Sequence, residues 1–188
     1  MNKKLIAIIV GAAVGILLAV VIYNSIKKEN EFNRSYFKPI ELSGNNRVFN
    51  QTDRPYLDTI VSVGLDFLMV KGTNVLIKDL PKDIKQRIDN SEEFDLRGAV
   101  AKVDGGYVIV LTRMSKREAM RVMSHELIHI QQYASGQLKP IDSITIKYKD
   151  NHYDITKVPY KDREWETDAF LRQSGLLTLI ESKLLEDE

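Results

Sequence analysis

The chain has 188 residues, 44% of them hydrophobic and 28% charged, which suits one folded domain with an appendage and argues against a disordered chain. Its 27 basic and 26 acidic residues give a formal net charge of +1 and are interspersed, so no basic surface indicates a nucleic-acid partner. The chain has no cysteine, which excludes disulfides and thiolate metal sites. Any bound metal must therefore be held by His, Asp or Glu.

Residues 1–28 predict a membrane anchor. The run from Leu5 to Tyr23 contains no charged residue, and a helix of that length can cross a hydrocarbon core of about 30 Å. A cleaved signal peptide is the alternative, although its apolar core normally has only about 7–15 residues and precedes a small-x-small cleavage site. The short basic tail before the run favours an inside N-terminus, which would put the remaining chain on the outer side, periplasmic or extracellular.

The chain after the anchor predicts a polar linker or lead-in followed by one folded domain. Residues 29–55 are rich in Asn, Ser, Gly and Pro, which is typical of turns and linkers. The folded domain is expected to cover residues 56–188. Hydrophobic periodicity and chain breakers predict its first elements: a helix over 56–70, a strand over 74–80 and a short helix over 82–89.

Two hairpins are predicted further along the chain. Strands over 99–103 and 107–111 are separated by Asp-Gly-Gly, whose glycines supply the positive φ of a tight turn. Alternating segments over 144–148 and 152–155 surround a second polar turn. The second hairpin is expected to form the lower lip of a cleft.

A helix with a strong chemical signal is predicted over residues 115–134. Ser115 and Glu118 have the capping-box spacing that begins a helix. Residues 125–129 read His-Glu-Leu-Ile-His, so the two histidines lie one turn apart on the same face and can bind one Zn²⁺. Glu126, beside the first histidine, is expected to take a proton from metal-bound water.

The surroundings of this motif decide how it is interpreted, because an HExxH string arises by chance in about one chain in a hundred of this length. Leu127, Ile128 and Ile130 predict a buried helix, in which two histidines and a carboxylate would be costly without a partner such as zinc. The hairpin before the helix also provides an edge strand. An extended peptide could bind along that strand through backbone hydrogen bonds.

A third zinc ligand is expected from a carboxylate downstream, since the chain has no cysteine. An amphipathic helix is predicted from Arg163 onward, and its first two turns carry Glu164, Glu166 and Asp168. The helix dipole also favours acids at this end, so their presence alone does not identify the ligand. Both glutamates meet the general requirement for a ligand.

Two segments share their pattern with a known family of enzymes. Residues 125–132 read HELIHIQQ, and residues 164–170 read EWETDAF. They resemble the compact gluzincin-type metallopeptidases, whose pattern is HExxHxxQ followed by a helix close to Pro-aromatic-Glu-x-Glu-Ala-aromatic. The likeness spans roughly residues 107–175. It implies an α+β fold of the zincin type and a zinc ion held by His125, His129 and Glu166, with Glu126 activating water.

Two positions depart from that pattern. Glu164 stands where the family has proline, and Asp168 stands where it has its second glutamate. Glu164 and Asp168 thereby form an ExxxD spacing, which in larger gluzincins pairs a zinc ligand with an acid that holds a histidine. Glu166 is preferred as the ligand because it matches the family's first glutamate, and Glu164 is its rival. Asp168 is then a candidate for accepting a hydrogen bond from a ligating histidine.

Other polar residues are candidates for supporting roles. A side-chain donor near the metal would stabilise the developing oxyanion, and the candidates are His152, Tyr153 and Tyr160, although such residues are common without function. Gln131 and Gln132 either support the ligands from behind or, as is more usual for glutamines on a helix, face water.

These features predict a membrane-anchored zinc metallopeptidase that acts on a peptide or protein substrate. Water is the nucleophile, and Glu126 moves the proton. One alternative is a non-catalytic, membrane-tethered binding or assembly protein that retains the fold. Another is a latent peptidase whose cleft is blocked by residues 29–54.

Overall fold

The computed structural model describes residues 40–80, 97–103 and 105–186, which form an α+β fold, as predicted. The predicted anchor over 1–28 and the predicted short helix over 82–89 lie outside these residues. Among the helices that the structure describes, none is both long and apolar enough to cross a bilayer. Membrane attachment therefore stays a prediction from the sequence.

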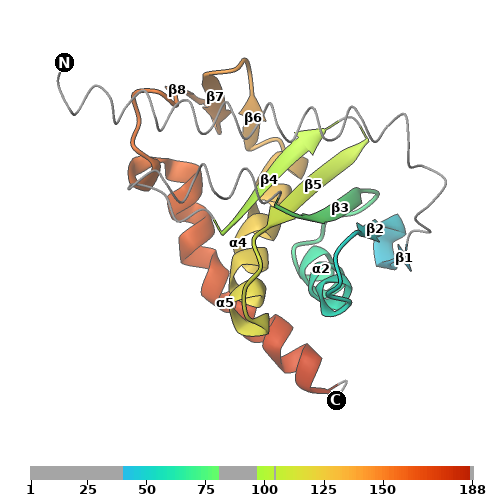
Figure 1. Cartoon of the computed structure of the whole chain (residues 1–188). Coiled ribbons are helices and arrows are strands. Elements are labelled where there is room, and N and C mark those ends of the chain that lie inside the picture. The colour runs from blue at the N-terminus through green and yellow to red at the C-terminus, as the bar shows by residue number, and fades with distance from the viewer. Residues whose placement is uncertain (1–39, 81–96, 104, 187–188) are drawn as a thin grey trace.

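A five-stranded sheet forms one layer of the fold (Figure 1). In chain order its strands are β1 (Ile40–Glu41), β2 (Arg47–Asn50), β3 (Asn74–Asp79), β4 (Gly98–Val103) and β5 (Gly106–Leu111). Their spatial order is β1-β2-β3-β5-β4. β2, β3 and β5 are parallel, whereas β4 and β5 form the predicted antiparallel hairpin. β1 and β4 therefore lie at opposite edges of the described sheet.

The strand β2 corrects the prediction that residues 29–55 are a linker and that the folded domain begins near Tyr56. β2 pairs in parallel with the first four residues of β3, and Val48 is completely buried in the core. Ser43, Gly44 and Asn45, which suggested a linker, form a short 3-10 helix before the strand. In the turn after the strand, the side chain of Asn50 accepts hydrogen bonds from the backbone N–H and the hydroxyl of Thr52. The folded unit thus includes residues 40–55.

Three helices of the described chain pack against one another, and two of them also pack against this sheet (Figure 1). The three helices are α2 (Tyr56–Phe67), α4 (Lys116–Ala134) and α5 (Glu164–Glu186), close to the predicted bounds, and α2 and α4 are the two that pack against the sheet. α4 begins with the predicted capping box of Ser115 and Glu118. Gly64 of α2 faces α4, where a Cβ atom would lie 2.5 Å from Cδ1 of Leu127. A glycine inside α2 therefore allows the two helices to approach closely.

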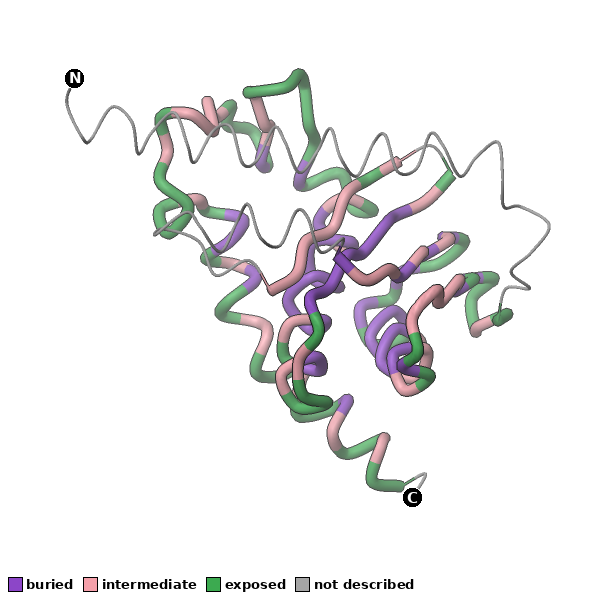
Figure 2. The backbone as a smooth tube through the Cα atoms, viewed as in Figure 1, coloured by how far each residue is buried: buried purple, intermediate pink, exposed green. Residues whose placement is uncertain are grey.

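The main hydrophobic core lies between the five-stranded sheet and the helices (Figure 2). Buried side chains gather along α2, α4 and β5. The fully buried members include Ile60, Val75, Ile109, Leu127 and Ile180. The HExxH segment therefore lies within the core, as the apolar neighbours predict, and its polar side chains are held in surroundings that water hardly reaches.

A small second sheet contains the predicted second hairpin. Its strands are β6 (Leu138–Pro140), β7 (Thr145–Tyr148) and β8 (Asn151–Asp154), of which β6 was not predicted. Leu138 and Tyr148 of this sheet pack with Trp165 of α5 in a second apolar cluster. Because Trp165 adjoins Glu166, this cluster holds the first turn of α5 in place.

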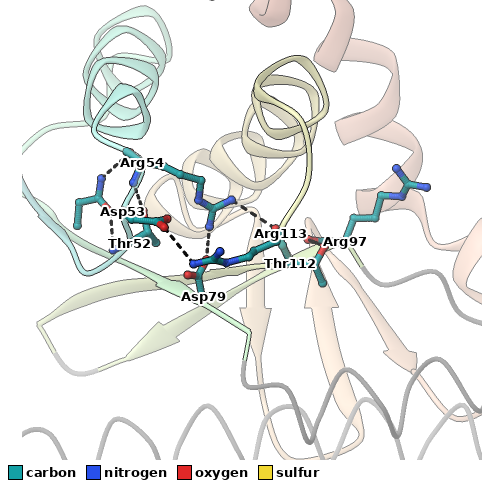
Figure 3. Close-up of polar contacts among 8 residues, drawn as sticks. Thr52, Asp53, Arg54, Asp79, Arg97, Thr112 and Arg113 are labelled. Carbon is teal, nitrogen blue, oxygen red and sulfur yellow. Dashed lines mark hydrogen bonds and ion pairs between the residues drawn. The ribbon is translucent and has the colours of Figure 1, made fainter.

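A buried arginine connects the ends of β3 and β5 (Figure 3). Arg54, between β2 and α2, forms an ion pair with Asp79 at the end of β3 and donates to the carbonyl of Thr112, 3.3 Å away, just after β5. The Arg54 side chain is only 10% exposed. We call Arg54, Asp79 and Thr112 the arginine cluster.

Candidate metal centre

The two histidines of α4 point their rings at one spot. His125 and His129 are both buried, and their ring planes meet at 87° with centroids 4.7 Å apart. Their Nε2 atoms lie 3.1 Å from each other. Helical spacing alone explains this arrangement, because residues four apart lie one above the other on the same face.

Glu166 of α5 completes a triangle of ligand atoms with these histidines. Its Oε2 atom lies 3.1 Å from Nε2 of His125 and 3.3 Å from Nε2 of His129. Glu164 lies away from the triangle and accepts a hydrogen bond of 2.5 Å from the hydroxyl of Tyr153. Of the two rival glutamates, the fold therefore brings Glu166 to the histidines.

The triangle has the dimensions of a zinc site. Ligand atoms about 2.0–2.1 Å from a tetrahedral Zn²⁺ lie about 3.3 Å from one another, and the observed separations are 3.1, 3.1 and 3.3 Å. Two imidazole nitrogens and one carboxylate oxygen are also the donor set of many catalytic zinc sites with three protein ligands. The residues thus fit the zinc ion that the sequence predicts.

In the metal-free triangle, contact with Glu166 favours the protonated form of His129. Burial lowers the pKa of His129, but the hydrogen bond and the negative charge of Glu166 outweigh burial and raise this pKa to about 9. Burial raises the pKa of Glu166, whereas its contacts with His125 and His129 outweigh burial and lower the pKa well below the ordinary value. A metal cation would therefore replace a proton at this point.

Glu126 is buried beside the triangle and belongs to a different set of contacts. Burial raises the pKa of its carboxyl group, and the nearby His129 and His125 oppose that rise. Its carboxylate accepts a hydrogen bond from the backbone of Val100 in β4. A Cβ atom on Gly98 would lie 3.4 Å from Oε1 of Glu126. The predicted general base is thus held against the edge strand of the sheet.

The register of β4 shows which backbone groups its outer edge presents. The N–H of Thr112 donates to the carbonyl of Arg97, so the polar backbone groups of Arg97 point towards β5. Since these directions alternate along a strand, Gly98, Val100 and Lys102 present their N–H and C=O groups to the outer edge. Among the strands described, none pairs with that edge.

The structure distinguishes between the three candidates for oxyanion stabilisation. The hydroxyl of Tyr160 forms a hydrogen bond with Glu166, which brings this side chain to the triangle. Tyr153 is bonded to Glu164, and His152 is exposed on β8. Of the three candidates, Tyr160 lies at the candidate metal centre. Phe170, which was not predicted to take part, lies with its ring centroid 4.6 Å from that of His125.

The support behind the histidines differs from the prediction. Asp168 accepts a hydrogen bond from Gln132, and the described contacts include none between Asp168 and a histidine. Gln132 is completely buried and contacts His129, so of its two predicted places, behind the ligands or facing water, it takes the first. The signal available in the sequence was its place three residues after His129, on the same face of the helix.

Comparisons with protein-family models, curated proteins and solved structures gave no match.

Proposed function

We propose that the chain is a zinc-dependent metallopeptidase in which His125, His129 and Glu166 hold the metal and Glu126 is the general base. The convergence of three ligand atoms at zinc spacing carries the proposal. A fourth buried group, the carboxylate of Glu126, lies beside them without being part of the triangle. A purely structural zinc site has no use for such a group, whereas hydrolysis requires a base.

The residues of the chain have distinct tasks in this reaction. A bound Zn²⁺ supplies a Lewis acid that acidifies water and polarises the scissile carbonyl. Glu126 accepts a proton from the attacking water and passes it to the nitrogen of the leaving amine as the C–N bond breaks. Because burial raises the pKa of Glu126, its carboxyl group is suited to holding that proton between the two steps.

Tyr160 is the proposed donor to the oxyanion that forms on the carbonyl carbon. Burial, followed by the charge of Glu166, raises the pKa of its hydroxyl, so the hydroxyl keeps its proton at neutral pH. A protonated phenol beside the reacting carbonyl can donate a hydrogen bond to the negative oxygen.

The outer edge of β4 supports a polypeptide as the substrate. Glu126 touches this edge at Val100, and the outward backbone groups of Gly98 and Lys102 lie on either side in the chain. An extended peptide paired with such an edge would bring its backbone past the carboxylate. β1 and β2 lie towards the opposite edge of the sheet, so residues 40–50 do not cover β4; residues 29–39 of the latent alternative lie outside the described residues.

The test compares the full-length chain with its Glu126→Gln variant. After zinc is supplied, both proteins should contain about one zinc per chain by elemental analysis. Cleavage of a fluorescence-quenched random peptide library should fall by about 10²–10⁴-fold in the variant. Equal cleavage by both proteins would refute Glu126 as the base. A wild-type chain that holds zinc but cleaves no peptide would favour the non-catalytic alternative.

A further inference from the structure

The side chain of Gln132 lies between the two helices that carry the candidate metal ligands. It is completely buried. Its Oε1 atom lies 2.8 Å from Nδ1 of His129. Its Nε2 atom donates to the backbone carbonyl of Trp165 at 3.0 Å and to Oδ2 of Asp168 at 2.8 Å. One amide group thus contacts a histidine on α4 and two acceptors on α5.

The two acceptors on α5 determine which way the amide of Gln132 is turned. An amide nitrogen has two protons to donate, and an amide oxygen can only accept. The Trp165 carbonyl and the Asp168 carboxylate both need a donor, so the nitrogen must face them. Turning the amide over would set three acceptor oxygens against one another in a buried place. The oxygen of Gln132 therefore faces His129.

The orientation of that amide in turn determines where His129 carries its proton. Because Oε1 can only accept, the Nδ1 atom of His129 must be the donor. In the neutral ring the lone pair then lies on Nε2, and this nitrogen faces Nε2 of His125 and Oε2 of Glu166. When zinc displaces the proton on Nε2, the remaining proton is thus the one that Gln132 already holds on Nδ1, which is the tautomer that a metal ligand needs.

His125 has no comparable support. Its Nδ1 atom is buried and has no hydrogen-bond partner among the residues described. Its ring instead packs beside Phe170, at a centroid distance of 4.6 Å. The two histidines of one motif are therefore unequal, because Gln132 holds a proton on Nδ1 of His129, whereas no described group accepts a proton from Nδ1 of His125.

Asp168 is itself held in place by a further contact between the helices. Its Oδ2 atom also accepts from Nη1 of Arg172 at 3.1 Å, and the same guanidinium nitrogen donates to Oε1 of Gln131 at 3.1 Å. Asp168 lies two residues after Glu166 on α5. A connected series of polar contacts thus runs from Arg172 through Asp168 and Gln132 to His129.

We propose that Gln132 is a positioning residue that sets His129 as a preorganised metal ligand, with its amide oriented by Asp168 and by the backbone of Trp165. This inference rests on the proposed zinc site and concerns its affinity. Removing groups that orient a ligating histidine typically costs 10–100-fold in metal affinity. If Gln132 only linked the two helices, its replacement would instead lower the stability of the metal-free fold and leave the affinity for zinc unchanged.

The test measures zinc affinity of the full-length chain by competition with a chromophoric chelator, without any substrate. Gln132→Met retains the length of the side chain and removes its polar contacts, so affinity should fall by about 10–100-fold. Gln131→Met is the matched control, because Gln131 contacts Arg172 but no histidine. Its affinity should stay within about twofold of wild type. Denaturant unfolding of each metal-free protein provides the separate measure of stability.

A shortened variant and a spectrum complete the test. Gln132→Asn keeps an amide at this position but withdraws it by one methylene from His129, so its zinc affinity should also fall below that of wild type, even if Gln132→Met does not fold. In zinc-loaded wild type, a nitrogen-15 imidazole spectrum should show the Nδ1 proton of His129 protected from exchange with water, and the same proton should exchange faster in Gln132→Asn.

The outcomes separate this inference from the proposed function. Equal zinc affinity of wild type and Gln132→Met, or equally fast exchange of the Nδ1 proton of His129 in wild type and Gln132→Asn, would overturn the role of Gln132 and leave the zinc site standing. A wild-type chain that binds no zinc would overturn both. Peptide cleavage enters neither measurement, so a folded zinc protein without activity would still test Gln132.

Discussion

The arginine cluster and the candidate metal centre are both buried and polar, but they differ in how their groups are satisfied. In the arginine cluster, Arg54 brings two donor nitrogens to the carboxylate of Asp79 and the carbonyl of Thr112 (Figure 3). In the metal centre, His125, His129 and Glu166 bring three ligand atoms to one point. In the first set both terminal nitrogens of Arg54 meet an acceptor, and only its buried Nε has no hydrogen-bond partner among the residues described. The second set consists of groups that can all give a lone pair.

This difference separates a cluster that holds the fold together from one that is suited to binding a cation. Burying a polar group is costly unless a partner of opposite character meets it. In the arginine cluster the chain supplies both sides of that match, and the result ties strand ends together. In the metal centre the chain supplies acceptors, so a cation is the natural partner. Whether buried donors meet buried acceptors is therefore more informative about function than burial itself.

The largest effect is expected from removing a proposed ligand of the candidate metal centre. Full-length His129→Ala and Glu166→Ala should hold almost no zinc by elemental analysis, because two remaining protein ligands bind it too weakly. Glu164→Ala is the matched control and should keep about one zinc per chain, since Glu164 contacts Tyr153 instead. Loss of zinc in the Glu164→Ala protein together with its retention in Glu166→Ala would reverse the assignment of the ligand.

A smaller effect, graded with pH, is expected in zinc binding. The pKa of His129 in the metal-free chain is raised to about 9, so this ring carries a proton at neutral pH that zinc must displace. The zinc association constant should therefore rise about tenfold for each pH unit up to about pH 9. Calorimetry in buffers of different ionisation enthalpy should show about one proton released at neutral pH. Binding without proton release would contradict the pairing of His129 with Glu166.

The arginine cluster should affect stability and leave metal binding alone. Arg54→Met removes the donors to Asp79 and to the carbonyl of Thr112, which should lower the free energy of unfolding by about 1–3 kcal/mol in urea. Arg113→Met removes an exposed ion pair with Asp53 and should cost less than about 1 kcal/mol. Zinc affinity should stay within about twofold in both proteins. A large loss of zinc affinity in Arg54→Met would show that the two clusters are coupled.

The smallest effects are expected from two helix glycines outside both clusters. Gly175 of α5 has no atom within 4 Å of the position of an added Cβ atom, so Gly175→Ala should stabilise the fold by about 0.5–1 kcal/mol. Gly64→Ala should lower stability by about 1 kcal/mol, because its Cβ would press on Leu127 of α4. Thermal unfolding of the two variants measures both changes. A stabilised Gly64→Ala protein would contradict the close approach of α2 and α4.

The sequence alone was sufficient wherever the determining interactions are local. The capping box, the length of α4 and the shared face of His125 and His129 follow from spacing along one helix. The two hairpins follow from strand patterns around short turns. The place of Glu126 beside His125 is likewise a property of the motif, and its role as the base stays a proposal.

The tertiary structure decided whatever depends on how distant segments meet. Glu164 and Glu166 lie about 200° apart around a helix of 3.6 residues per turn, so only the docking of α5 selects which one faces the histidines. β2 is stabilised by parallel pairing with β3, although α2 lies between the two strands in the sequence. The polar residues around β2 make the strand hard to recognise from local composition. Gln132 likewise became a supporting residue only when α5 brought Trp165 and Asp168 to its amide. Local periodicity carries no information about such long-range contacts, because they depend on the rotation and position of whole elements.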